Sequence, residues 1–488
     1  MSEIGSDTAA AAGGKSTVAK VTLATLTAMV VGSMIGAGVF SLPARFGVAT
    51  GVIGAVVAWT IAGLGMLMLA FVFQTLAVRK PDLDAGVFAY AKAGFGDYIG
   101  FNSAFGFWAS ACVGNTFYWI FIMTTIGRAF PALGKGDTIL AVALSSAGVW
   151  TFHYLISRGV KEAATINRIV TIAKILPILL FIVVVALSFS AGQFHANFWG
   201  GQPASFSTLY EQVKNTMIIT TFVFLGIEGA SVYSRYAKRR EDVGKATVLG
   251  FLSVLAIFAL VTLLSYGVMP TQELANARQP SMASVLASVV GSWGSTVISI
   301  GVVVSVLGAY LAWTLMSAEV MYIPATNEDM PKFLKRLNRA GVPIAALILT
   351  SLLIQIFLVV TLSSEDALNF MLDLCTSLAL VPYFLVAAYG FKLAITKETY
   401  ESEAKARRSQ AIIAGLATIY TVFLVYAAGL KFLLLSCIIY APGTVLYVKA
   451  RRENDKLLFR RAEAVLCGTL IVGGVAGVIG LASGAITI

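Results

Sequence analysis

The sequence has little charge for its length. Of its 488 residues, 58% are hydrophobic and only 12% are charged, and it has two His. Soluble proteins average about 25% charged residues. Half that proportion leaves too little polar surface to cover a soluble body of this size. The composition therefore argues against a soluble enzyme, a soluble nucleic-acid binder or a disordered chain.

The sequence also lacks the residue clusters of metal and catalytic sites. Its four cysteines lie inside apolar runs without a CxxC pair, which indicates neither a disulfide framework nor a metal site. There is no Gly-rich phosphate loop, no nucleophile elbow, and no convergence of acids, His and Ser at one depth. We therefore expect a protein that is not an enzyme and that holds no cofactor or metal.

Long apolar runs are abundant. A membrane-spanning helix needs about 20 mostly apolar residues. The first run is too long for a signal peptide, and no connection is long enough for a soluble domain. We expect an all-α membrane protein with about 13 transmembrane helices, at approximately 21–46, 52–78, 99–127, 138–157, 168–190, 213–234, 246–269, 294–322, 342–362, 367–391, 409–430, 432–448 and 462–485.

The basic residues predict the orientation of these helices. Most of the 35 Lys and Arg fall in the N-terminal tail and in the gaps after even-numbered helices. Since Lys and Arg are retained on the cytoplasmic side, the N-terminus is predicted inside and the C-terminus outside. Membrane topology and contact with anionic lipid then explain the excess of basic residues, and no nucleic-acid partner is expected. The few cations of the odd-numbered gaps are Arg45, Arg128, Lys135, Arg278 and Lys431.

Two of the predicted helices are interrupted by glycines. Helix 1 contains GSMIGAGVF at 32–40, and helix 6 contains LGIEGAS at 225–231. Glycine costs about 1 kcal/mol per residue in a helix relative to alanine. Close packing of helices through small residues is one explanation. The corresponding positions in helices 1 and 6 favour another: two inverted five-helix repeats with paired broken helices, as in one class of secondary transporters. Unwound backbone there offers N–H groups to a carboxylate and carbonyls to an ammonium, which suits a zwitterionic amino acid.

These motifs resemble a known family. GSMIGAGVFSLPA in helix 1 and FLGIEGAS in helix 6 are similar to the amino acid–polyamine–organocation superfamily, and within it to the basic amino acid/polyamine antiporters, especially the arginine/ornithine exchangers. The similarity extends over about residues 20–400. Further matching motifs are CVGN at 112–115, WTL at 313–315, RAGVP at 339–343 and VPY at 381–383.

The resemblance implies a substrate site in both broken helices. The α-carboxylate would bind the helix-1 backbone at Ser33, Met34, Gly36, Ala37 and Gly38, and the α-ammonium would bind carbonyls near Phe222, Leu225 and Ile227. Phe222 stands where arginine/agmatine relatives have a gating tryptophan. Ser33 and Ala37 replace an asparagine and a serine of those relatives, which argues against agmatine as the partner substrate.

Two side chains are candidates for the cationic end of the substrate. Trp313 lies near the membrane middle, where its ring is either a cation–π platform or a filler of the bundle. Asn115 matches a substrate-contacting asparagine of the relatives, and the alternative is a polar clasp between helices.

Charged residues inside the spans are candidates for gating and coupling. Glu228 in the helix-6 break either attracts cationic substrate, acts as a proton-sensitive gate or forms a structural salt bridge. Asp373 in helix 10 is expected to line the external vestibule. Lys174 either reaches the cytoplasmic interface or, as the resemblance implies, occupies the space of a sodium ion beside the helix-1 break, which argues against sodium coupling.

The resulting hypothesis is a secondary transporter of a bacterial inner membrane that exchanges arginine for ornithine by alternating access. A lysine or arginine/lysine permease with proton coupling is the alternative, and a sensor or channel without transport is a hypothesis of another class. We expect a cytoplasmic tail at 1–20, a ten-helix core at 21–400 with repeats at about 21–190 and 213–392, and three peripheral helices at 401–488, which are candidates for a homodimer contact.

Overall fold

The computed structural model describes residues 22–487 except 84–85, 160–162, 229–239, 365 and 401–402. Apart from one isolated bridge between Leu337 and Pro343, the described secondary structure is helical. Its helices are α1 (Leu23–Met34), η1 (Ala37–Ser41), α2 (Leu42–Ala49), α3 (Val52–Arg79), α4 (Val87–Phe95), α5 (Asp97–Ile126), η2 (Pro131–Leu133), α6 (Ile139–Ser157), α7 (Ala163–Leu187), α8 (Ala191–Ala196), α9 (Phe206–Val223), α11 (Arg240–Ser265), α12 (Thr271–Ala275), α13 (Ser281–Val290), α14 (Ser292–Thr326), η4 (Lys332–Lys335), α15 (Ile344–Val360), η5 (Thr361–Ser363), α16 (Ala367–Ile395), α17 (Ala404–Glu453) and α18 (Arg461–Ala482).

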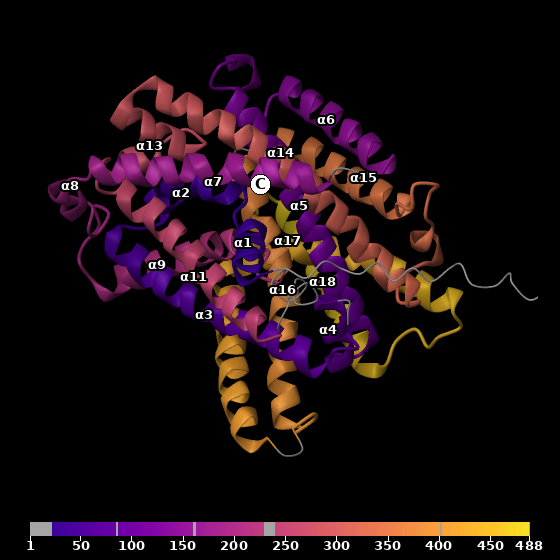
Figure 1. Cartoon of the computed structure of the whole chain (residues 1–488). Coiled ribbons are helices and arrows are strands. Elements are labelled where there is room, and N and C mark those ends of the chain that lie inside the picture. The colour runs from indigo at the N-terminus through magenta and orange to yellow at the C-terminus, as the bar shows by residue number, and fades with distance from the viewer. Residues whose placement is uncertain are drawn as a thin grey trace, which may run out of the picture.

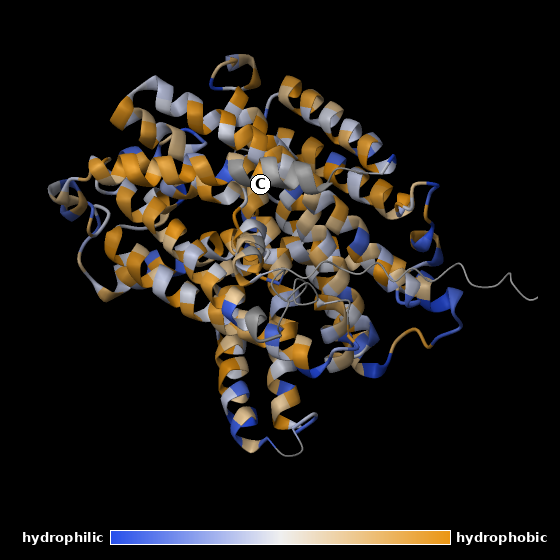
Figure 2. Ribbon diagram, in the orientation of Figure 1, coloured by the Kyte–Doolittle hydropathy of each residue, from blue (hydrophilic) through white to orange (hydrophobic). Residues whose placement is uncertain are grey.

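The apolar helices identify an integral membrane protein. Among the described residues, nine helices are long and apolar enough to span a membrane. The count rises to ten if α1 and the segment 37–49, which meet at 50°, form one bent span. Apolar residues cover most of the helical body, whereas hydrophilic residues gather at loops such as the tip between α16 and α17 (Figure 2). The all-helical membrane class predicted from the sequence is confirmed.

The predicted span 213–234 has a different form in the structure. α9 begins at Phe206, before the predicted span, and ends at Val223, inside it; its sequence contains Glu211, Gln212, Lys214 and Asn215 as well as several threonines. The residues after 228 in this predicted span lie outside the described residues up to Arg240, where α11 begins.

The predicted spans 409–430 and 432–448 are joined in the 50-residue α17. Gly429 interrupts this helix with φ 76° and ψ 169°, which is not a helical conformation. The two halves have different neighbours. Tyr420 lies against Gly65 of α3, whereas Tyr440 lies against Gly106 of α5. α16 and α17 project together as two legs from the lower part of the body in Figure 1.

The long helices pack in two groups. In the first group α11 packs on α1 and α3, and α3 packs on α9; α5, α6, α14 and α15 form the second group. α7 touches α11 of the first group and α14 of the second, and α16 packs on α5 while also touching α3 and α9. In Figure 1, α1 is viewed near its axis at the centre of the molecule, between these groups. The helix-1 interruption, at the end of α1, therefore lies where the two groups meet.

Candidate functional site

The interruptions of helices 1 and 6 touch each other. α1 ends at Met34, and the chain resumes as η1 after the extended Gly36 (φ −114°, ψ −156°). α9 ends at Val223, and Gly226 follows with φ 106°, a value that favours glycine. The Ser33 Oγ donates to the Gly226 carbonyl at 3.3 Å. A Cβ on Gly226 would stand 2.5 Å from the Ser33 carbonyl oxygen, so this approach also requires glycine.

A buried cavity of about 40 Å³ lies against these two interruptions. Eight of the ten predicted binding residues line it, and the other two, Asn115 and Ile227, do not. None of the described residues that form its wall is Asp, Glu, Lys, Arg or His. The lining comprises Ser33, Met34, Gly36, Ala37, Gly38, Val39, Phe107, Ser110, Ala111, Gly114, Tyr118, Phe222, Val223, Leu225, Phe258, Trp313 and Cys375.

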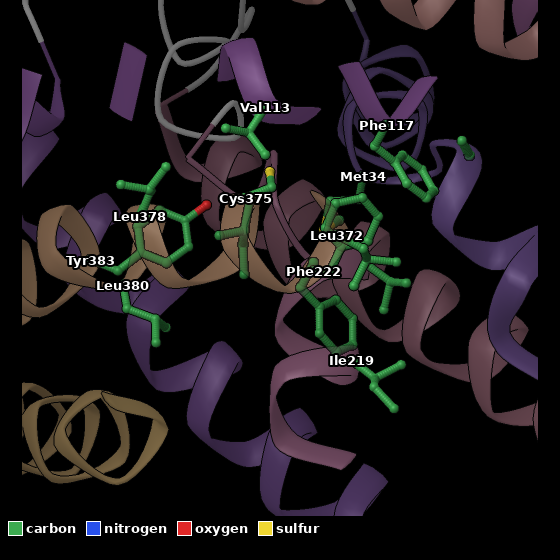
Figure 3. Close-up of a cluster of buried hydrophobic side chains, with 14 of the residues drawn as sticks. Met34, Val113, Phe117, Ile219, Phe222, Leu372, Cys375, Leu378, Leu380 and Tyr383 are labelled. Atoms are coloured by element: carbon green, nitrogen blue, oxygen red, sulfur yellow. The ribbon is translucent and has the colours of Figure 1, made fainter. Parts of the chain in front are cut away.

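Aromatic rings form much of the cavity wall. Phe222 lies over the helix-1 interruption, since a Cβ on Gly38 would stand 2.9 Å from its ring. Phe117 meets Phe222 edge-on with 5.2 Å between ring centroids. Figure 3 shows Phe117, Phe222 and Met34 near one another in the buried region, together with Cys375. Phe107 and Trp313 form a second pair, with ring centroids 6.4 Å apart. The cavity thus offers π faces but no formal charge.

Asn115 belongs to α5, which contributes to the cavity wall, but its own side chain does not line the cavity. Its Nδ2 donates to the Thr314 Oγ1 at 3.3 Å, and Thr314 follows Trp313 on α14. The Asn115 Oδ1 is buried and has no hydrogen-bond partner within the described structure. A buried acceptor without a donor is costly, and this oxygen lies behind the cavity wall. Ile227 is buried in the turn after Gly226, and its N–H donates to the Phe224 carbonyl.

Lys174 lies beside the last turn of α1. Its side chain is buried, and its Nζ donates to the Gly32 carbonyl at 2.5 Å. That carbonyl belongs to the end of α1, where backbone carbonyls have no intrahelical N–H partner. The ammonium therefore caps the helix from inside the protein and does not reach toward the interface.

Glu228 is buried behind the helix-6 interruption. Its Oε2 accepts a hydrogen bond from the Tyr383 hydroxyl of α16 at 2.6 Å. The same oxygen accepts from the Gly226 N–H at 3.2 Å. The carboxylate thus ties the turn that carries Gly226 to α16, outside the cavity lining.

Asp373 pairs with Arg45. The ion pair joins α16 to α2, the continuation of the first span, and the two side chains are 21% and 10% exposed. The pair lies outside the cavity lining.

Several residues that line the cavity were not predicted from the sequence as binding residues. Phe107, Ala111, Gly114 and Tyr118 recur at three- to four-residue intervals on α5, which places them on one face of that helix. Because α5 is apolar on nearly every side, its helical period alone does not single out the face that meets the cavity. Cys375 had no such signal. It reaches the cavity because Ser110 holds α16 close, donating to the Cys375 carbonyl at 2.7 Å.

The described residues contain no cluster of three or more His, Cys, Asp and Glu that could hold a metal ion. The cavity chemistry suits a small zwitterion with a cationic side chain: backbone groups of two interrupted helices, aromatic faces and one free amide oxygen nearby.

Comparison with known proteins gives consistent matches. Residues 21–443 match the family described as amino acid permease. The chain is 47% identical over 475 residues to the arginine/ornithine antiporter of Pseudomonas aeruginosa, covering 96% of this chain and 98% of that protein. It is 38% identical to the L-lysine transport protein of Corynebacterium glutamicum, covering 99% of each. It is also 36% identical to the arginine/agmatine antiporter of Chlamydia pneumoniae, covering 90% of this chain and 92% of that protein.

Proposed function

Because the chain belongs to the amino acid permease family, we propose that it exchanges arginine for ornithine across a bacterial inner membrane by alternating access. The observation that carries this proposal is the uncharged cavity between the two touching helix interruptions, with Trp313 and Phe107 in its wall. The relatives named as arginine/ornithine and arginine/agmatine antiporters support the cationic substrate class.

The zwitterionic end of the substrate binds to the backbone. The amides of Gly36, Ala37 and Gly38 precede the first intrahelical hydrogen bonds of η1, so they are free to receive the α-carboxylate. The α-ammonium binds carbonyls of the helix-6 interruption at Phe222, Leu225 and Ile227.

The cationic end lies against Trp313. A guanidinium or ammonium over a desolvated indole gains about 2 kcal/mol, and the unpaired Asn115 Oδ1 adds an acceptor behind this wall. A cavity of about 40 Å³ holds only a few water molecules. Substrate entry therefore displaces part of the wall, and Phe222, which lies over Gly38, is the gate.

The charged residues control the cycle. Lys174 supplies a fixed positive charge to the end of α1, where sodium-coupled relatives of this fold would need a metal ion, so exchange proceeds without sodium. Glu228 couples the helix-6 turn to α16 and acts as a proton-sensitive gate. The Arg45–Asp373 pair closes the external path.

The two groups of helices described above are the moving parts. α1, α3, α9 and α11 swing as a bundle against α5, α6, α14 and α15. We place about 13 spans in the chain, counting α17 as two on either side of Gly429. The inverted repeats cover about 21–190 and 213–392 within a core at 21–400, after a cytoplasmic tail at 1–20. Three helices at 401–488 contact lipid or a second copy and bring the C-terminus outside.

A lysine permease is the second candidate. Its support is the 38% identity to a relative named L-lysine transport protein. Ornithine and lysine differ by one methylene, which is worth only about 1 kcal/mol in a pocket.

Counterflow in proteoliposomes tests the proposal. Uptake of labelled arginine should rise when ornithine is loaded inside, relative to empty vesicles. Stimulation by internal lysine but not ornithine would favour the second candidate. An arginine uptake rate that is the same with and without an internal amino acid would refute exchange. A current that does not saturate with arginine concentration would indicate a channel.

A further inference from the structure

The Tyr118 hydroxyl points at the helix-1 interruption. Tyr118 belongs to α5, and a Cβ built on Gly36 would stand 3.4 Å from its hydroxyl oxygen. Gly36 is the residue at which the backbone leaves the α1 helix and enters η1. Both residues line the cavity. The hydroxyl therefore reaches the cavity beside the backbone amides at 36–38.

This hydroxyl has no hydrogen-bond partner within the described part of the chain. Tyr118 is 7% exposed, and it lines the cavity beside Gly36. Among the buried tyrosines, Tyr383 donates to Glu228 and Tyr266 donates to the Thr50 carbonyl, whereas the hydroxyls of Tyr310, Tyr420 and Tyr447 also lack a partner in the described structure but do not line the cavity. A hydroxyl that faces a cavity without a protein partner is expected to bond to a polar group that enters that cavity.

We infer that Tyr118 is a specificity-determining residue, whose hydroxyl donates to the substrate α-carboxylate at the helix-1 interruption. The inference rests on the proposed function, because it places the carboxylate at residues 36–38. A hydroxyl can donate to a carboxylate, whereas an ester or a missing carboxyl group offers it a weaker acceptor or none. Tyr118 thus makes the site prefer amino acids over amines with the same side chain.

The cavity composition supports a donor at this point. No Lys, Arg or His is among the described lining residues, so the carboxylate has no cationic partner there. Neutral donors must supply its hydrogen bonds. The single Ser33 Oγ proton is already shared between the carbonyls of Val30 at 2.8 Å and Gly226 at 3.3 Å. The Ser110 Oγ donates to the Cys375 carbonyl. Among the hydroxyl groups of the described lining residues, the one of Tyr118 is thus free to donate.

Replacing Tyr118 by phenylalanine tests this inference, because the ring is kept and only the hydroxyl is lost. Dissociation constants of purified protein in detergent are measured by calorimetry for L-arginine, arginine methyl ester and agmatine. In Tyr118→Phe, the dissociation constant for L-arginine should rise about tenfold or more, since a hydrogen bond to a charged group is lost. The constants for the ester and agmatine should change less than about threefold. If neither arginine methyl ester nor agmatine binds measurably to either protein, the tenfold weaker binding of arginine by Tyr118→Phe supports the inference.

Two results would overturn it. One is an arginine constant that changes less than about threefold, and the other is an equal loss for arginine and for the two probes without a carboxylate. Tyr420→Phe is the matched control, because its buried hydroxyl also lacks a partner within the described structure but lies against α3. That variant should bind all three compounds like the unmodified protein. Elution as a single peak in detergent shows that each variant is folded.

The inference and the proposed function fail differently. If the unmodified protein shows no counterflow of arginine and ornithine, the proposed function fails. If counterflow is intact and Tyr118→Phe keeps its preference for arginine over the ester, only the role of Tyr118 fails.

Discussion

The Lys174 Nζ donates a hydrogen bond to the Gly32 carbonyl, 2.5 Å away, and so joins α7 to the last turn of α1 before its interruption. The ammonium is buried, and it faces a carbonyl that has no intrahelical partner. A positive charge at the C-terminal end of a helix is favourable, and its strength grows with burial. The position of the helix-1 interruption therefore depends on a charge carried by another helix.

Replacing Lys174 by methionine should reduce exchange by about tenfold or more, because a charge-assisted hydrogen bond is worth about 1.5–3 kcal/mol. Counterflow should proceed equally in sodium and choline buffers for the unmodified protein. The control is Lys214→Met, since Lys214 is a partly exposed lysine paired with Glu211. Full activity of Lys174→Met, or a sodium requirement in the unmodified protein, would contradict the role assigned to Lys174.

Replacing Trp313 by leucine should weaken arginine binding by about 5- to 30-fold, which corresponds to loss of about 1–2 kcal/mol of cation–π attraction. The loss is measured as a dissociation constant. Trp150→Leu serves as the control, because Trp150 is 40% exposed on α6 and lies outside the cavity lining. An unchanged constant for Trp313→Leu would remove the indole from the site.

Removing the Arg45–Asp373 pair should open the site to the outside. Asp373→Asn breaks the ion pair. Each loss of about 1.4 kcal/mol from the free energy that favours the externally closed state changes the ratio of closed to open protein about tenfold. The thiol of Cys375, which lines the cavity, reports this opening when Cys112, Cys437 and Cys467 are replaced by alanine. A membrane-impermeant thiol reagent added outside should label Cys375 faster in Asp373→Asn. Equal labelling rates would show that the pair does not close the external path.

Glu228→Gln should slow exchange and make its rate less dependent on pH, because the amide cannot titrate. The amide oxygen can still accept from Tyr383. Tyr383→Phe is the matched variant, since it removes the hydroxyl and keeps the carboxyl group. If Glu228→Gln retains the pH profile of the unmodified protein, Glu228 is not the proton-sensitive gate.

A charge network at the ends of α4, α5 and α14 should contribute to stability. The Lys92 Nζ contacts both Asp329 oxygens at 2.6 Å, and Asp97 joins Lys92 to Arg451 of α17. Burial raises the pKa of Asp329, and Lys92 opposes that shift. Lys92→Met should therefore destabilise the protein by about 1–3 kcal/mol near pH 7, measured by thermal unfolding in detergent.

The sign of the pH effect follows from the raised pKa. Without Lys92, protonation of Asp329 removes a buried unpaired charge, so the deficit of Lys92→Met should shrink as the pH falls. The double variant Lys92→Met/Asp329→Asn should recover most of the stability at pH 7. A double variant as unstable as the single one would show that the two residues are not coupled.

The sequence predicted the cavity largely through glycine. Gly36, Gly38 and Gly226 mark positions where the backbone leaves the helix or another chain segment approaches closely, and these are properties that a sequence records. The contribution of α5 was harder to predict, because its 30 residues are apolar on nearly every side. With no polar face, the period alone does not tell which side meets α16 and which meets α14.

Contacts between segments far apart in the sequence could not be predicted either. Nothing near Arg45 indicates that its partner lies 328 residues later, and nothing near Glu463 indicates that its carboxylate accepts from the Tyr98 N–H at the start of α5. Such pairs follow from the packing of whole helices. The short helices α4 and α13 lie between predicted spans, and they are too short for a search based on span length.

The absence of charged side chains from the described cavity lining has an electrical consequence. With no counter-ion in the wall, the bound substrate keeps its net charge of one as it crosses the membrane. Moving that charge through 100 mV involves about 2.3 kcal/mol. In a one-for-one exchange of arginine for ornithine, the inward and outward legs cancel this work. The membrane voltage then neither drives nor opposes the cycle, and the two concentration gradients alone set its direction.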